Sequence, residues 1–157
     1  EGVLANHPKA NIVKVTSNGE VSLATANMSF PNGAVITPDG KTLIVAETLG
    51  LCLTAFDITE NSELINRRVW ANTGARVPDG ICMNADGNIW IANAVSNECA
   101  LLAQGGEVVE IVNTSQNCYA CMLGGTDDKT LFMLTAQSSH AAIAGASRAG
   151  KIEMAKV

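Results

Sequence analysis

PNGAVITPDGKTLIVAET, residues 31–48, is the stretch that decides the fold, because it joins two short apolar runs through a Gly/Asp turn. The same arrangement recurs in PDGICMNADGNIWIANA at residues 78–94 and in YACMLGGTDDKTLFMLTA at residues 119–136. Gly33, Gly80 and Ala120 occupy the same place in the three copies, which gives spacings of 47 and 40 residues. A period of roughly 40 to 50 residues is typical of the blades of a β-propeller.

Each of the first two copies is followed by two further strand-like runs, and four strands make a propeller blade. These runs are LCLTAFDI and NRRVWAN after the first copy, and ECALLA and EVVEIVN after the second. NIVKV and VSLATA precede the first copy and flank Asn18-Gly19, a strong hairpin signal, and GKIEMAKV follows the third. The sequence therefore predicts one all-β, partial β-propeller domain over residues 1–157. Its parts are outer strands at 10–26, blades at 30–71 and 77–114, and a last blade at 118–157 without its outermost strand.

Composition excludes several classes of protein. The net charge of −5 offers no basic surface for a phosphate backbone, so we expect no nucleic-acid partner. No apolar stretch is long enough to span a membrane, and EGVLANHPKA at the start lacks the layout of a signal peptide, so we expect no membrane association. The five cysteines, with Cys118 and Cys121 in a lone C-x-x-C, indicate buried, reduced thiols and a cytoplasmic location.

These segments resemble the senescence-marker-protein and gluconolactonase family in nearly unbroken register from about residue 11 to residue 157. The resemblance rests on FPNGAVITPDGKTLIVAET, RVPDGICMNADGNIWIANA, ACMLGGTDDKTLFMLTA and the terminal GKIEMAKV, in this order and at blade spacing. It implies the C-terminal half, about three blades, of a six-bladed ring with four-stranded antiparallel blades. It further implies lactone hydrolysis to hydroxy acids with one divalent metal ion in the central channel.

The resemblance implies that Asn32, in P-N-G, and Asp79, in P-D-G, are metal ligands, and that a third ligand is a glutamate of the first blade. Both residues directly precede the innermost strand of consecutive blades, so we expect them at one mouth of the channel. Their oxygens suit Ca²⁺ best, with Mg²⁺, Mn²⁺ and Zn²⁺ as alternatives. The competing interpretation is that both tripeptides are only turns. Glu1 does not fit the missing glutamate, because Val3 stands where the family motif has proline.

The resemblance also implies that Asp79 is the catalytic base that removes a proton from the attacking water. Glu47 and Asn93 end the second strands of two blades and are candidates for the rim of a substrate pocket, as is Gln137. The alternative for these side chains is a solvated loop edge or a hydrogen bond to a neighbouring blade. His140 is also a candidate for the substrate pocket. It lies in QSSHAAIAGASRAG, a long run of small residues that we expect to form a loop, either a lid or a mobile insertion.

Two functions remain open at this stage. The first is a metal-dependent lactone hydrolase acting on a small-molecule lactone, with this chain supplying part of the active site. The second is a non-catalytic propeller fragment or subunit that acts as an assembly module. Open blades expose strand edges, so we expect either a missing N-terminal half or a second copy of the chain to close the ring.

Overall fold

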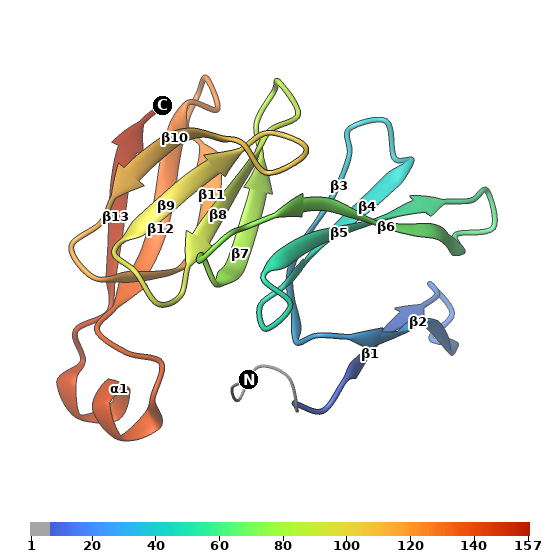
Figure 1. Ribbon diagram of the computed structural model, residues 1–157, viewed down its shortest axis with the longest axis horizontal. Coiled ribbons are helices and arrows are strands. Elements are labelled where there is room, and N and C mark those ends of the chain that lie inside the picture. The colour runs from blue at the N-terminus through green and yellow to red at the C-terminus, as the bar shows by residue number, and fades with distance from the viewer. Residues whose placement is uncertain (1–6) are drawn as a thin grey trace.

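The computed structural model describes residues 7–157, which form thirteen antiparallel strands and one short helix (Figure 1). The first two sheets contain β1 (Ala10–Val15) with β2 (Val21–Met28), and β3 (Pro31–Ile36), β4 (Thr42–Glu47), β5 (Cys52–Ile58) and β6 (Leu64–Asn72). The third contains β7 (Pro78–Met83), β8 (Ile89–Asn93), β9 (Glu98–Leu102) and β10 (Val108–Asn113). The fourth contains β11 (Asn117–Gly124), β12 (Thr130–Ala136) and β13 (Lys151–Lys156). Glu1 and Val3, weighed above as part of a ligand motif, lie outside the described residues.

The predicted all-β partial propeller is confirmed. The sheets follow one another along the chain with two, four, four and three strands, and each sheet is a simple meander in which neighbours in sequence are neighbours in space. Figure 1 shows the sheets side by side, with the β1–β2 hairpin next to the β3–β6 sheet and the β11–β13 sheet at the far end. Among residues 7–157, no helix is long and apolar enough to cross a membrane.

The first strands of successive sheets contact one another directly, in the order β3, β7, β11. A glycine stands at each crossing. A Cβ atom added to Gly33 would lie 2.5 Å from the backbone oxygen of Asp79, and one added to Gly80 would lie 2.7 Å from the Cα of Ala120. The absence of a side chain therefore lets each inner strand press against the backbone of the next.

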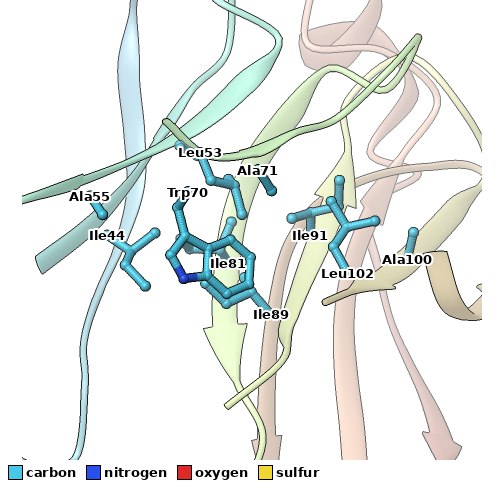
Figure 2. Close-up of a cluster of buried hydrophobic side chains, with 11 residues drawn as sticks. Ile44, Leu53, Ala55, Trp70, Ala71, Ile81, Ile89, Ile91, Ala100 and Leu102 are labelled. Atoms are coloured by element: carbon cyan, nitrogen blue, oxygen red, sulfur yellow. The ribbon is translucent and has the colours of Figure 1, made fainter. Parts of the chain in front are cut away.

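Apolar side chains fill the space between consecutive sheets. Trp70 of β6 points toward Ile81 and Ile89 of the next sheet, and Ile44 and Leu53 line the same cluster (Figure 2). A second cluster joins the β7–β10 sheet to the β11–β13 sheet and contains Trp90, Leu131, Met133 and the thiols of Cys82, Cys99, Cys118 and Cys121. Met28, Val45 and Phe56 form a third cluster between the hairpin and the first four-stranded sheet. The reading of Cys118 and Cys121 as buried free thiols is confirmed.

The segment between β12 and β13 differs from the loop that we expected. It contains a seven-residue helix, α1 (Ala141–Ser147), none of whose residues is buried. The run AAIAGAS is rich in alanine, the residue with the highest intrinsic helix propensity, and Arg148 ends the helix in the left-handed conformation with φ of 43°. Local propensity rather than packing therefore accounts for this helix, which projects from the sheets in Figure 1.

Candidate functional site

Asn32 and Asp79 come together at the starts of two neighbouring inner strands. Pro31 begins β3 and Pro78 begins β7, so each candidate ligand is the second residue of its strand. The close approach of the strands at Gly33 places the two residues opposite each other, close enough for Asn32 to affect the pKa of the Asp79 carboxyl. The two side chains thus meet in space although 47 residues separate them in sequence.

The Asp79 carboxylate lies in an environment that disfavours its charge. Burial raises its pKa above the ordinary value, and the neighbouring Asn32 side chain offsets this effect only in part. Within residues 7–157, no lysine or arginine forms an ion pair with Asp79. A partly buried carboxylate without a cationic side chain beside it can accept either a proton or a metal cation.

The donor set fits a hard divalent cation but is incomplete. Asn32 offers an amide oxygen and Asp79 offers carboxylate oxygens, which are the ligand types of Ca²⁺ and Mg²⁺. In the part of the chain that the structure describes, no three His, Cys, Asp or Glu side chains form a cluster that could hold a metal ion. Asn32 and Asp79 would therefore hold the ion together with further ligands that do not come from such a cluster.

Glu47, a candidate for the pocket rim, is buried at the end of β4 with only 3% of its surface exposed. Its Oε2 accepts the backbone N–H of Ser29 at 2.5 Å, and its Oε1 accepts the Thr54 hydroxyl at 2.6 Å and the Arg67 guanidinium at 3.0 Å. Burial opposes ionisation of Glu47, but these bonds outweigh it and lower the pKa of the carboxyl. In this structure Glu47 connects β4, β5 and β6 to the segment that leads into Asn32.

Asn93 occupies the equivalent position at the end of β8 and is equally buried. Its Oδ1 accepts the backbone N–H of Val77 at 3.2 Å, and its amide donates to Glu98, which forms an ion pair with Arg76 at 2.9 Å. Asn93 thus holds the segment that leads into Asp79 as Glu47 holds the segment that leads into Asn32. The hydrogen bonds of both side chains stay within their own blades, on strands of the same sheet and on the segment that leads into it, rather than crossing to a neighbouring blade.

His140 lies on the segment that joins β12 to β13. It is exposed at the N-terminal end of α1, where its backbone N–H donates to Ser138. Gln137, also exposed, immediately follows β12. Tyr119, which replaces Asn32 and Asp79 in the third repeat, lies on β11, where its carbonyl oxygen faces Gly80. The structure therefore brings Asn32 and Asp79 together, whereas no hydrogen bond or ion pair of the described residues joins His140 to either of them.

The sequence reasoning missed Thr48, the residue after Glu47. Its hydroxyl accepts a hydrogen bond from Nδ2 of Asn32 at 3.3 Å and donates one to the carbonyl oxygen of Pro78 at 2.8 Å. Thr48 is therefore joined to Asn32 in its own sheet and, in the next sheet, to Pro78, the residue before Asp79. No local signal marks it, because its partners lie 16 and 30 residues away.

A groove of about 820 Å³ lies at the other end of the inner strands. Ile36, Met83 and Met122 line it, together with the turns that follow these strands, whereas Asn32 and Asp79 are absent from its lining. The groove and the Asn32–Asp79 pair are therefore two separate features at opposite ends of the same strands.

Comparison with known proteins gives a consistent family. Residues 3–137 match the model of the SMP-30/Gluconolactonase/LRE-like region. The fold is similar to that of a luciferin-regenerating enzyme (TM-score 0.84, 14% identity), with coverage of 99% of this chain and 54% of that one. It is also similar to that of a calcium-binding regucalcin from Agrobacterium tumefaciens (TM-score 0.76, 20% identity), with coverage of 93% of this chain and 52% of that one. A gluconolactonase from Xanthomonas campestris is similar as well (TM-score 0.69, 23% identity), with coverage of 81% of this chain and 42% of that one.

At these identities the solved structures establish the fold, and the chain spans about half of their length. The family follows from the sequence match, which extends over most of the chain and includes Asn32, Asp79, Glu47 and Asn93. The chain belongs to the SMP-30/gluconolactonase/LRE-like family.

Proposed function

We propose that this chain carries two cation ligands, Asn32 and Asp79, and the catalytic base, Asp79, of a metal-dependent lactone hydrolase. The observation that carries the proposal is the meeting of these two side chains at the starts of neighbouring inner strands. Family membership supports the same assignment, as does the gluconolactonase among the similar structures. Ca²⁺ is our first choice of ion, because both donors are oxygens and one similar structure is a calcium-binding protein.

In the proposed reaction, Asp79 accepts a proton from the water molecule that attacks the lactone carbonyl. The water oxygen forms a bond to the carbonyl carbon, the bond from that carbon to the ring oxygen breaks, and the ring oxygen takes up a proton to give the hydroxy acid. The raised pKa of Asp79 supports this role, because a carboxylate destabilised by burial is a stronger base. A bound divalent cation would polarise the carbonyl. Asn32 would serve as a positioning ligand of the cation only.

The test is hydrolysis of glucono-1,5-lactone by the full chain, measured as the rate of acid release with and without added Ca²⁺. We expect a Ca²⁺-dependent rate that Asp79→Asn lowers at least about a hundredfold, the usual contribution of a general base. The chain offers a matched control, because Pro38-Asp39-Gly40 repeats the tripeptide Pro78-Asp79-Gly80 in an exposed turn. Asp39→Asn should leave the rate unchanged. Equal rates for the two variants, or no Ca²⁺-dependent rate in the wild type, would reject the proposal.

Assembly is a second candidate function, and one observation favours it. The β1–β2 hairpin exposes a row of apolar side chains, among which Val21 is 66% exposed and Leu23 62% exposed. A surface of this kind marks a contact with another chain, and we propose a second copy as the partner. Sedimentation should then give about twice the 16.3 kDa of one chain. A mass of one chain at every concentration would reject self-association.

A further inference from the structure

Thr48 links the two candidate ligands. It directly follows β4, its side chain is buried, and its hydroxyl lies between Asn32 on β3 and the backbone of Pro78 on β7. Pro78 immediately precedes Asp79, so one hydroxyl joins the side chain of one ligand to the backbone beside the other. This contact crosses from one sheet to the next at the point where the two candidate ligands meet.

The chemistry of the partners determines the direction of both hydrogen bonds. The carbonyl oxygen of Pro78 can only accept, so the single proton of the Thr48 hydroxyl is donated to it, at 2.8 Å. The hydroxyl oxygen is then free only to accept, and its partner in Asn32 must be the NH₂ group, at 3.3 Å. This assignment settles the orientation of the Asn32 amide, because the other orientation would place two acceptors against each other.

The second N–H of the same NH₂ group is not used by Thr48, and Asp79 lies beside Asn32 where the two inner strands touch at Gly33. The amide oxygen of Asn32 is directed away from Thr48 and retains its lone pairs. An oxygen held in this way is an acceptor or a metal ligand that needs no rearrangement before binding.

Comparison of the repeats separates this role from blade architecture. Ala94 follows β8 as Thr48 follows β4, since Pro78 pairs with Asn93 as Pro31 pairs with Glu47. The backbone N–H of Ala94 donates to Val77 at 3.0 Å, and that of Thr48 donates to Phe30 at the same distance. The second blade forms this turn with no hydroxyl, so the turn itself does not require one.

We propose that Thr48 is a positioning residue of the cation site, which fixes the amide of Asn32 so that its oxygen is presented to the ion. This inference rests on the proposed function, because it takes Asn32 to be a ligand. Thr48 itself touches neither ion nor substrate. The residue acts through Asn32, and its own hydroxyl is consumed by Pro78.

The test is the affinity of the full chain for Ca²⁺, measured by titration calorimetry. We expect Thr48→Val, which keeps the shape and removes the hydroxyl, to weaken binding by about tenfold, the lower end for residues that orient a metal ligand. Thr48→Ser, which restores the hydroxyl, should bind within about threefold of the wild type, a tolerance of less than 1 kcal/mol. If Thr48→Val does not fold, Thr48→Ala introduces the residue of the second blade and should show the same loss.

Thr114→Val is the matched control, because Thr114 is also buried and also donates its hydroxyl to a backbone carbonyl, that of Gln116, at 2.7 Å. It should lose stability as Thr48→Val does but keep its Ca²⁺ affinity. Unchanged affinity in Thr48→Val, or an equal loss in Thr114→Val, would overturn the role of Thr48 and leave the proposed site intact. A wild type that binds no Ca²⁺ would overturn the proposed metal site and this inference with it.

Discussion

Gly33→Ala should destabilise the chain by about 2 kcal/mol, because it forces apart the two inner strands that carry Asn32 and Asp79. The new Cβ would lie 2.5 Å from the oxygen of Asp79 and 2.6 Å from the nitrogen of Ile81. Ordinary van der Waals contact begins at 3.4 Å, so β7 would have to recede by about 0.9 Å. All the atoms involved belong to the backbone of β7, which cannot rotate out of the way as a side chain would.

The magnitude combines two opposing effects. Overpacking against a rigid neighbour costs up to about 3 kcal/mol. Replacement of glycine by alanine also restricts the unfolded chain, which returns up to about 1 kcal/mol. The difference of about 2 kcal/mol should lower the urea midpoint by about 1 M for a slope near 2 kcal/mol/M, with the slope unchanged. Fluorescence of Trp70 and Trp90, both buried, reports the unfolding.

Gly145→Ala is the control for the same chemical change in open space. Gly145 lies in α1, and a Cβ added there meets nothing within 4 Å. Alanine favours the helix, so this variant should be as stable as the wild type or more stable by up to about 1 kcal/mol. The explanation fails if Gly33→Ala has the midpoint of the wild type, or if Gly145→Ala falls as far as Gly33→Ala does.

Three further predictions concern charge, core and thiols. The lowered pKa of Glu47 means that its ionised form stabilises the fold above the ordinary pKa of 4.5 and that this contribution is lost as the pH falls through the folded value. Glu47→Gln should therefore cost about 2 kcal/mol at pH 7 and flatten the loss of stability below pH 4.5, as measured by urea unfolding at each pH. Parallel curves of stability against pH for the two proteins would contradict this. Ile91→Ala, at a fully buried position, should lower the free energy of unfolding by about 3 kcal/mol. Ile152→Ala, at a position 70% exposed, should lower it by less than about 0.5 kcal/mol. Equal urea midpoints for the two variants would be the contrary result. A hydrogen bond to Cys121 and burial raise the pKa of Cys82 far above the ordinary thiol value. Cys82 should therefore react with Ellman's reagent at pH 8 only after the chain is unfolded in urea. Labelling of Cys82 in the native chain at the rate seen in the unfolded chain would refute this.

The sequence alone was sufficient for the architecture, because the propeller is built from local rules repeated at a fixed period. The Gly/Asp turn at Gly40 and the alternation of short apolar runs specify antiparallel strands, and the spacing from Gly33 to Gly80 specifies the blade. The two glycines also stand where the inner strands touch. The helix at 141–147 was missed, because the small residues around it were read as a loop.

The site was only partly accessible from sequence. Asn32 and Asp79 could be named because each lies in a recognisable tripeptide at the start of an inner strand. Glu47 and Asn93 could be named as strand ends, but their burial and their bonds to Ser29 and Val77 depend on how the strands return beside each other. A strand end carries no local mark that says whether its side chain faces solvent or its own sheet.

By itself, then, the sequence determined which residues form strands, how many strands make a blade, and which two oxygen donors begin neighbouring inner strands. Only the tertiary structure decided that Thr48 joins Asn32 to Pro78, and that the Asp79 carboxylate is partly buried. The physical reason is range. Strand and turn propensities act over a few residues, whereas the orientation of an amide and the pKa of a carboxyl are set by atoms that the fold brings together from different sheets.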